Sequence, residues 1–275
     1  MSAAAVPEAF SSLTGPPGTR FREIRWFEEI DSTNRYLGDC AAAGAAEGLV
    51  AAADHQRAGR GRLGRRWEAP PGRNLLVSIL LRPSLGPGAL HLCTAVVALA
   101  AAAACERLAV VTPSLKWPND LMVGERKLAG VLAETAGVAG APSAVVVGIG
   151  VNVGWPAPDG EPGEAAVPAE IAPIATSLWR ESGRRHEPRA LLQLLLADLE
   201  PRVAALRGAA GRRAQAAEYR RRCATVGRRV RVELHGETVV GEAADVTPEG
   251  HLLVDVGACL RTVTAGDVVH LRDGS

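Results

Sequence analysis

Two nearly continuous apolar runs constrain the fold of this chain more than any other feature. Asn74–Leu81 reads NLLVSILL, and Ala144–Val153 reads AVVVGIGVNV, the run richest in β-branched residues. Apolar runs of this length fit strands buried inside a sheet. We expect further strands at Phe21–Ile30 and Leu49–Asp54, and an alanine-rich helix at Leu90–Leu108 that packs on the sheet. Hydrophobic residues make up 47% of the chain, which is enough for a substantial core. The expected strands and helix together predict an α+β fold.

The pattern changes near Thr225, where short alternating strands separated by turns begin. About 50 residues of this kind are typical of a small antiparallel barrel. Residues 175–219 read as helix with an apolar, core-facing stripe. Residues 1–20, with prolines and small polar residues, read as a flexible lead-in. The sequence therefore predicts three units: the lead-in over residues 1–20, a core over 21–223 and a C-terminal domain over 224–275.

Composition excludes several classes of protein. Lys and Arg number 31 and Asp and Glu 30, so the net charge is only +1 and creates no overall field for nucleic acid or membrane. Five scattered cysteines without CxxC spacing indicate no zinc site or disulfide framework, but thiols in a reducing cytosol. No secretory signal opens the chain, and the longest apolar tract, Leu92–Ala104, is shorter than the roughly 20 residues of a membrane span. We expect a cytoplasmic protein that is not associated with a membrane.

Positive charge is concentrated in one segment, QRAGRGRLGRRW at Gln56–Trp67, which no acidic residue interrupts. Glycine lets the backbone adopt positive φ and approach a ligand closely. Guanidinium forks and backbone N–H groups bind the oxygens of phosphate or carboxylate. The segment therefore predicts an anion-binding loop. A solvated basic loop or an RNA contact are the alternatives, and RNA is disfavoured because the loop has one aromatic residue and the charge elsewhere is balanced.

Three further motifs accompany this loop: DSTNRYL at 31–37, KWPNDLMVGERKLAGVLAET at 116–135 and GIGVNV at 148–153. Each has an ordinary structural interpretation when it is taken alone. Ser32–Asn34 could be a helix N-cap. Trp117 could be a packed side chain in a turn, Lys127 a solvated lysine, and Asn152 a strand residue that bonds neighbouring backbone groups.

Together these motifs supply what activation of a carboxylate by a nucleoside triphosphate requires. The hydroxyl and amide groups of Ser32–Asn34 offer neutral donors and acceptors. Two anions must meet in line, so fixed cations such as Lys116 and Lys127 have to offset their repulsion. Asp120 could help to hold a divalent metal ion. Neutral polar contacts come from Asn119 and Asn152.

In these motifs the chain resembles the biotin–protein ligases, the enzymes that biotinylate acetyl-CoA carboxylase and related carboxylases. The family pattern GRGRxGR…W corresponds to Gly59–Trp67, KWPND to Lys116–Asp120 and RKLAG(I/V)L to Arg126–Leu132. The pattern STN corresponds to Ser32–Asn34, and GIGxN to Gly148–Asn152. They occur in the family order, and the resemblance covers about residues 22–272. The implied fold is a mixed-sheet catalytic core of the biotin/lipoate ligase type, followed by a small SH3-like β-barrel.

The resemblance implies a two-step reaction. Biotin and Mg-ATP give biotinyl-5′-AMP and pyrophosphate, and a lysine of a biotin carboxyl carrier protein then attacks the mixed anhydride and releases AMP. The implied biotin contacts are Ser32, Thr33, Asn34, Gln56, Arg60, Gly61, Arg62, Lys127 and Gly130. The implied ATP or adenylate contacts are Arg60, Arg62, Trp67, Lys116, Asn119, Asp120 and Asn152, with Asp120 also implied as a ligand of Mg²⁺. The implied catalytic residues are Lys127, which holds the biotin carboxylate and stabilises the α-phosphate, and Arg62.

Two departures from the family pattern bear on function. Leu63 stands where many relatives carry a third arginine, but Arg60 and Arg62 remain, so we expect the function to survive. Some relatives carry an N-terminal winged helix-turn-helix and repress transcription. About 20 residues precede the core here, too few for that module, so direct operator binding is not expected.

Other functions remain as alternatives. A lipoate–protein ligase shares the catalytic fold, but the arginine loop together with KWPND favours biotin. A biotin-sensing binder without transferase activity is a further alternative. In such a protein, replacement of Lys127 would weaken biotin binding, and there would be no catalytic turnover to abolish. The family pairs through sheet edges in some members and is monomeric in others, so both a monomer and a homodimer stay open. The carrier proteins that are modified, and the role of the C-terminal barrel, also stay open.

Overall fold

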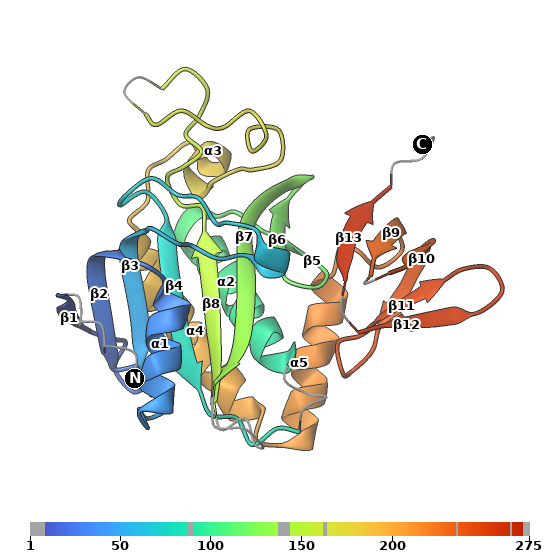
Figure 1. Cartoon of the computed structure of the whole chain (residues 1–275), viewed down its shortest axis with the longest axis horizontal. Coiled ribbons are helices and arrows are strands. Elements are labelled where there is room, and N and C mark those ends of the chain that lie inside the picture. The colour runs from blue at the N-terminus through green and yellow to red at the C-terminus, as the bar shows by residue number, and fades with distance from the viewer. Residues whose placement is uncertain are drawn as a thin grey trace.

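The computed structural model describes residues 9–86, 91–136, 144–161, 164–234, 236–264 and 266–271. Within them, an eight-stranded sheet has the strand order β1-β2-β3-β4-β8-β7-β6-β5 (Figure 1). β2 and β3 are parallel and the other neighbours antiparallel, so the mixed sheet is confirmed. The strands are β1 Ser11–Thr14, β2 Glu23–Ile30, β3 Val50–Gln56, β4 Leu75–Leu81, β5 Ser114–Lys116, β6 Asp120–Val123, β7 Arg126–Ala136 and β8 Ala144–Val151.

Side chains of the central strands alternate between two apolar clusters, one on each face of the sheet. On β4, Ile79 belongs to the larger cluster and Leu80 to the smaller one, as the period of two in a strand requires. Helices α2 His91–Ala109 and α4 Pro188–Ala205 cover the larger cluster, and α1 Thr33–Ala42 covers the other face (Figure 1). The two apolar runs are therefore central strands buried on both faces, as their composition predicts.

Helix α2 is long and apolar enough to cross a membrane by length and composition. However, 72% of its most apolar window is buried inside the fold. It packs against α4, α5 and β7, and its alanines allow these elements to approach closely. Its apolar character is therefore explained by packing within the protein.

The prediction of a flexible lead-in over residues 1–20 is wrong for the second half of that range. β1 pairs antiparallel with β2 at the edge of the sheet. Arg20 forms ion pairs with Glu47 and Glu200, each at 2.9 Å, and its backbone N–H donates to Glu200 at 2.8 Å. Composition could not reveal these partners because Glu200 lies 180 residues away. Residues 1–8 lie outside the described part of the chain.

Residues 175–219 contain three helices instead of one continuous helix. α3 Leu178–Ser182 ends at Gly183, which has φ 70°. α4 has Pro188 in its first turn, and α5 Ala209–Arg222 begins after Gly208. Glycine readily adopts the left-handed conformation that ends a helix, and proline suits the first turn of the next one. Glycine and proline therefore explain the breaks between these helices, and the prediction missed them because it relied on the apolar stripe of α4.

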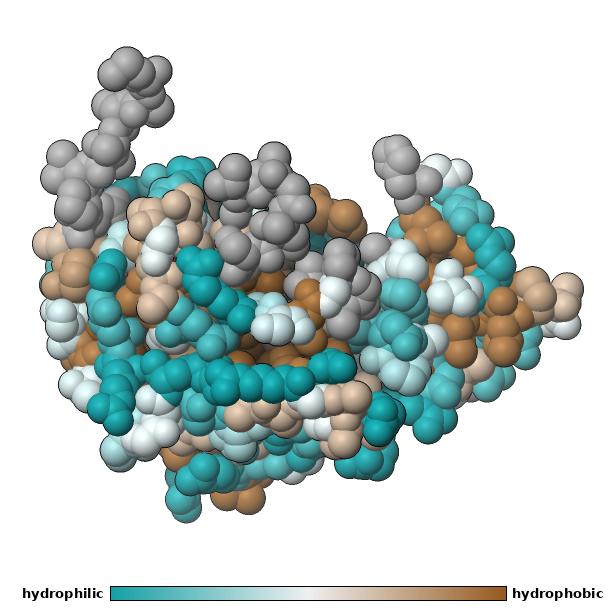
Figure 2. All heavy atoms as spheres, turned by 90° about the horizontal axis from the view of Figure 1, so that it is seen from below, coloured by the Kyte–Doolittle hydropathy of each residue, from teal (hydrophilic) through white to brown (hydrophobic). Residues whose placement is uncertain are grey.

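The C-terminal part forms a separate five-stranded antiparallel sheet of order β12-β11-β10-β9-β13. Its strands are β9 Arg229–Glu233, β10 Thr238–Val246, β11 Leu252–Asp255, β12 Leu260–Val263 and β13 Asp267–His270. Figure 2 shows this domain as a lobe beside the core, with apolar side chains scattered over a largely polar surface. A small antiparallel C-terminal domain is thus confirmed, whereas the limits of the three predicted units stay predictions.

The turn between β5 and β6 fastens this lobe to the core. The backbone N–H of Trp117 donates to Thr225 Oγ1 at 3.0 Å, and its indole N–H donates to Gly250 O at 2.8 Å. Ala224 N also donates to Leu115 O at 2.7 Å. Trp117 is buried, so these hydrogen bonds are protected from competition by water. The packed-turn interpretation of Trp117 is therefore correct.

Val110, at the end of α2, holds a strained backbone conformation. It has φ 57° and is 90% exposed, so a β-branched side chain occupies the left-handed region without burying apolar surface. Glycine adopts this conformation without strain, so Val110→Gly should raise the free energy of unfolding by about 1 kcal/mol in urea denaturation. Arg107→Gly, at an exposed position in the last turn of α2, should lower it by up to about 1 kcal/mol. A destabilised Val110→Gly variant would contradict the strain argument.

His270 makes the stability of the protein depend on pH. Its Nε2 lies 3.0 Å from Thr225 Oγ1, and burial, followed by the charges of Lys116 and Arg228, lowers the pKa of His270 to about 4. The folded state therefore binds this proton less readily than the unfolded chain, so the free energy of unfolding should fall as the pH drops from about 6.5 toward 4. In urea titrations, His270→Gln should reduce the loss between pH 7 and pH 5 by about 1 kcal/mol. Identical pH profiles for both proteins would count against this effect.

Candidate active site

A cavity opens on the α1 face of the sheet, beneath the segment of residues 56–67. It is partly open to solvent, and its empty space, including solvent at the mouth, is about 840 Å³. Most residues that the sequence predicts to bind ligands line it: Ser32, Thr33, Asn34, Gln56, Arg60, Gly61, Arg62, Trp67, Asn119, Asp120, Lys127 and Gly130. Segments distant in the sequence are thus brought to one place, although the role of each residue stays a prediction.

Glycines create the floor of this cavity. A Cβ atom at Gly148 would lie 2.2 Å from Asn34 Oδ1, and one at Gly150 would lie 2.4 Å from the Trp67 ring. Gly130 pairs directly with Gly150 across β7 and β8, so two adjacent positions of the sheet lack side chains. The GIG motif is therefore required because Asn34 and Trp67 occupy the space that larger residues would fill.

Neutral polar groups at the start of α1 form a buried network. Ser32 caps the helix, which agrees with the N-cap interpretation. The backbone N–H of Thr33 donates to Gln56 Oε1 at 2.8 Å, and Thr33 Oγ1 lies 2.7 Å from Ser78 Oγ. Ser78 Oγ in turn donates to Asn34 Oδ1 at 2.6 Å. These neutral hydroxyl and amide groups bond mainly to one another, and Asn34 Nδ2 also donates to the Glu134 carboxylate at 2.7 Å. Neutral groups of this kind suit recognition of a neutral polar ligand group.

Residues 59–67 form a short hairpin over the cavity. Trp67 N donates to Gly59 O at 3.1 Å, and Gly61 N donates to Arg65 O at 2.7 Å. A Cβ atom at Gly59 would lie 2.5 Å from Trp67 O, so only glycine allows the two arms to approach. Leu63, at the tip, has φ 55° and is exposed. The predicted close-approach loop is therefore present, with its arginines around the cavity.

Lys127 lies on β7 at the centre of the site. Its Nζ is 2.7 Å from Asp120 Oδ1 and 5.6 Å from the centre of the Trp67 ring. Its side chain is 33% exposed, so Lys127 is not a fully solvated surface lysine. Its backbone is also fixed, because Lys127 O accepts a hydrogen bond from Thr176 N at 2.9 Å.

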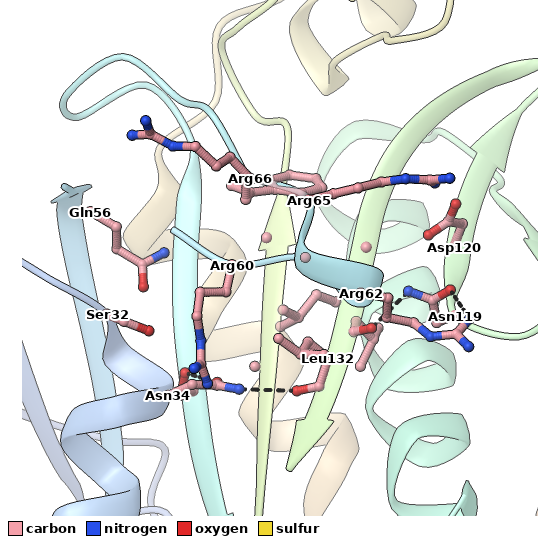
Figure 3. Close-up of a pocket in the computed structure, with 18 of the residues that line it drawn as sticks. Ser32, Asn34, Gln56, Arg60, Arg62, Arg65, Arg66, Asn119, Asp120 and Leu132 are labelled. Atoms are coloured by element: carbon pink, nitrogen blue, oxygen red, sulfur yellow. Dashed lines mark hydrogen bonds between the residues drawn. The ribbon is translucent and has the colours of Figure 1, made fainter. Parts of the chain in front are cut away.

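The arginines of the hairpin point to different parts of the cavity (Figure 3). Arg60 descends toward Asn34 and forms an ion pair with Glu134. Arg62 reaches the other side, where its Nη1 donates to Asn119 Oδ1 at 3.2 Å. One loop therefore places positive charge at both ends of the cavity.

Arg62 is the most enclosed of these arginines. Burial lowers the pKa of Arg62, and the nearby carboxylates of Asp120 and Asp267 oppose this shift. A guanidinium remains charged throughout the physiological range. A partly desolvated, permanent cation of this kind interacts strongly with an anionic ligand, because screening by water is reduced.

Two predicted ligand-binding residues do not line this cavity, namely Lys116 and Asn152. Asn152 is buried, and its Nδ2 donates to Thr176 O at 2.9 Å and to Lys127 O at 3.4 Å. Its Oδ1 accepts from Asn74 Nδ2 at 3.1 Å. This geometry gives its predicted ATP contact no support and agrees with the alternative, a strand residue that bonds neighbouring backbone groups. Asn152 thereby helps to fix the backbone of Lys127.

The site also contains residues that were not predicted, among them Ser78, Glu134, Gly148, Gly150 and Asp267. Ser78 is the one polar side chain inside the run Leu75–Leu81, which was a usable signal. The two glycines stood in a recognised motif without a role. Asp267 carried no local signal, because it comes from the C-terminal domain and meets Arg65 across 202 residues.

The acidic residues of the cavity offer few ligands for a metal ion. Among the residues that the structure describes, no group of three or more His, Cys, Asp or Glu side chains could hold one. Mg²⁺ commonly binds through one or two carboxylates together with substrate phosphates and water. Asp120 lines the cavity and supplies one such carboxylate. The site therefore fits a magnesium ion that arrives with ATP and offers no complete metal cage.

Comparisons with known proteins agree with this geometry. The sequence profile of the Biotin/lipoate A/B protein ligase family matches residues 26–152, and that of the Biotin protein ligase C terminal domain matches residues 225–271. The biotin–[acetyl-CoA-carboxylase] ligase of Mycobacterium tuberculosis is 38% identical over 93% of this chain and 91% of its own length. The bifunctional ligase/repressor BirA of Bacillus spizizenii is 28% identical over 87% of this chain and 71% of its own.

A solved structure of biotin protein ligase from Aquifex aeolicus, in complex with biotin and ATP, superposes with a TM-score of 0.75 at 26% identity. It covers 91% of this chain and 99% of its own. The fold and the cavity thus define a protein of the biotin/lipoate ligase class. Within that class, the chain belongs to the biotin protein ligase family.

The glycine floor can be tested by adding a single methyl group. Gly150→Ala should displace the Trp67 ring, since the new Cβ would approach three ring atoms at 2.4–2.8 Å. We expect at least a tenfold loss of affinity for the cavity's ligand, measured by calorimetry with biotin, because small shifts in a binding site are costly. Gly38→Ala in α1, where a Cβ meets open space, is the matched control and should bind normally. Normal binding by Gly150→Ala would show that Trp67 does not shape the site.

Proposed function

We propose that this chain activates biotin with ATP as biotinyl-5′-AMP and transfers the biotinyl group to a lysine of a biotin carboxyl carrier domain. The observation that carries this proposal is the convergence of Lys127 and the hairpin arginines on a cavity with a neutral polar end. Such a cavity suits a molecule with a neutral polar head and an anionic tail. The names of the relatives that match most of the chain favour biotin over lipoate and catalysis over mere binding.

In the first step, a biotin carboxylate oxygen attacks the α-phosphorus of ATP. A phosphorus–oxygen bond forms and the bond to the departing pyrophosphate breaks. Both reactants are anions, so fixed cations must offset their repulsion and the charge that develops at the phosphorus. Lys127 and Arg62 are assigned this role, with Arg60 close to the polar end. Mg²⁺, when bound with ATP, would neutralise phosphate charge, and Asp120, which lines the cavity, is the residue that we propose would hold it.

In the second step, the amine of the carrier lysine attacks the carbonyl carbon of the adenylate. The carbon–oxygen bond to AMP breaks, and the amine loses a proton as the amide forms. Until then the mixed anhydride must be kept from water. The hairpin of residues 59–67, with Trp67 packed on the glycine floor, is the element positioned to cover it.

The polar end of the cavity is assigned to the ring system of biotin. Ser32, Thr33, Asn34 and Gln56 present hydroxyl and amide groups, which match a neutral ureido group better than charged side chains would. These groups already bond to one another, so little ordering is needed on binding, and this lowers the cost of association.

The expected partner is the biotin carboxyl carrier domain of acetyl-CoA carboxylase or a related carboxylase, and the expected compartment is the cytoplasm. The names of two relatives, from Mycobacterium tuberculosis and Paracoccus denitrificans, support the carboxylase assignment. The absence of direct DNA binding and the choice between monomer and homodimer stay predictions.

The reaction is tested by pyrophosphate release from purified protein with Mg-ATP and biotin, lipoate or no acid. A carrier domain is then added and its mass is measured. Biotin-dependent pyrophosphate release and a biotin-sized mass gain are expected. Lipoate-dependent turnover would overturn the substrate assignment, and biotin binding without pyrophosphate release would overturn the enzymatic one.

The chain contains only two lysines, Lys116 and Lys127, so each can be replaced to compare their roles. Lys127→Ala should lower the rate of adenylate formation by about 10²-fold or more, because it removes a fixed cation from the reacting centre. Lys116→Ala should cost much less, since Lys116 does not line the cavity. Single-turnover pyrophosphate release measures both, and circular dichroism verifies folding. A folded Lys127→Ala variant with normal adenylation would refute the assigned role.

A further inference from the structure

Cations around the cavity have carboxylate partners within the protein. Arg60 pairs with Glu134 and Arg65 pairs with Asp267. Of these four residues, all but Glu134 line the cavity that the proposed function assigns to biotin and the adenylate. Positive charge that is meant for a ligand is therefore already neutralised within the chain.

Glu134 joins two parts of the site. One of its oxygens pairs with Arg60 of the hairpin, and the other accepts a hydrogen bond from Asn34 Nδ2 at 2.7 Å. Asn34 Nδ2 also donates to Leu132 O at 3.3 Å (Figure 3). The Glu134 side chain is 37% exposed, so its carboxylate is anchored on one side and open to exchange of partners on the other.

Asp267 performs the equivalent contact from a different domain. It lies at the start of β13 in the C-terminal sheet and pairs with Arg65 on the rim of the cavity. Arg65 is 66% exposed and Asp267 30%. Two acidic residues on separate sheets thus hold the two arms of one hairpin by equivalent bonds.

We propose that Glu134 and Asp267 are affinity-determining residues, internal anions that occupy Arg60 and Arg65 until an anionic ligand replaces them. An arginine that binds a phosphate or carboxylate must first leave its internal partner, so part of the binding free energy is spent on this exchange. The two carboxylates keep the ligand-free hairpin ordered and weaken retention of the adenylate, which favours its delivery to the carrier. The identity of the anion rests on the proposed function, but the exchange itself does not.

The charge-removing variants Glu134→Gln and Asp267→Asn test this exchange, since both preserve shape. ATP binding is measured by calorimetry, and release of preformed biotinyl-5′-AMP by rapid dilution. Each variant should bind ATP about two- to fivefold more tightly and release the adenylate about two- to fivefold more slowly, as expected for one partly exposed ion pair. Hydrogen exchange at residues 59–67 should be faster in the ligand-free variants than in the unmodified protein.

Opposite directions in these readouts separate the proposal from a merely structural role. A structural role predicts faster exchange together with weaker ATP binding and faster adenylate release, and that combination would overturn the proposal, as would unchanged affinities. Glu134→Asp, which keeps the charge, should restore release toward the original rate. Glu237→Gln removes a half-exposed ion pair with Arg261 on the C-terminal sheet and should alter neither readout. If no adenylate forms even with the unmodified protein, the proposed function fails, while ATP affinity still tests the exchange.

Discussion

The absence of side chains at Gly148 and Gly150 is the constraint on which the rest of the site depends. Both glycines belong to a strand that is otherwise filled with β-branched residues and buried on both faces. Where the α1 face of this strand carries Ala144 and Val146, the strand belongs to the apolar cluster that α1 covers. Where the same face carries glycine, Asn34 and Trp67 enter the space instead. The strand β8 therefore serves both as part of the core and as part of the cavity floor, and the size of each residue decides which of the two it forms.

The C-terminal lobe is linked to the cavity because the turn that holds the lobe also carries a residue that lines the cavity, Asn119. Asn119 Nδ2 donates to Val131 O at 2.8 Å, and its Oδ1 accepts from Arg62. Two residues earlier, Trp117 bonds the lobe through Gly250. A displacement of the lobe would thus be transmitted through a rigid turn to the most enclosed arginine. The hydrogen bonds at both ends are buried or partly buried, so such a displacement is costly.

Local chemistry made much of the site predictable. Glycine and arginine in alternation predicted a loop that approaches a ligand closely, and the neutral residues of Ser32–Asn34 predicted neutral polar contacts, because these properties belong to the residues themselves. Glu134, Asp267 and the strand β1 were missed because their roles depend on partners far away in the sequence. The ATP contact of Asn152 stays a prediction, but the sequence could not show that its amide already bonds to the backbone and to Asn74.

Space around Lys127 explains why a lysine stands at the centre of the site, in a chain whose only other lysine is Lys116 and whose remaining basic side chains of this kind are arginines. A Cβ atom on Gly130 would lie 3.1 Å from Lys127 Nζ and 3.1 Å from the Trp67 ring, so both groups lie close to the Gly130 backbone. A guanidinium is planar and needs room in its plane, whereas an ammonium is a compact charge on a flexible stem. The compact ammonium, paired with Asp120, therefore suits the limited space beside the indole. The glycine floor leaves room for the Trp67 ring, and the ring in turn leaves room for the ammonium of Lys127 but not for a planar guanidinium.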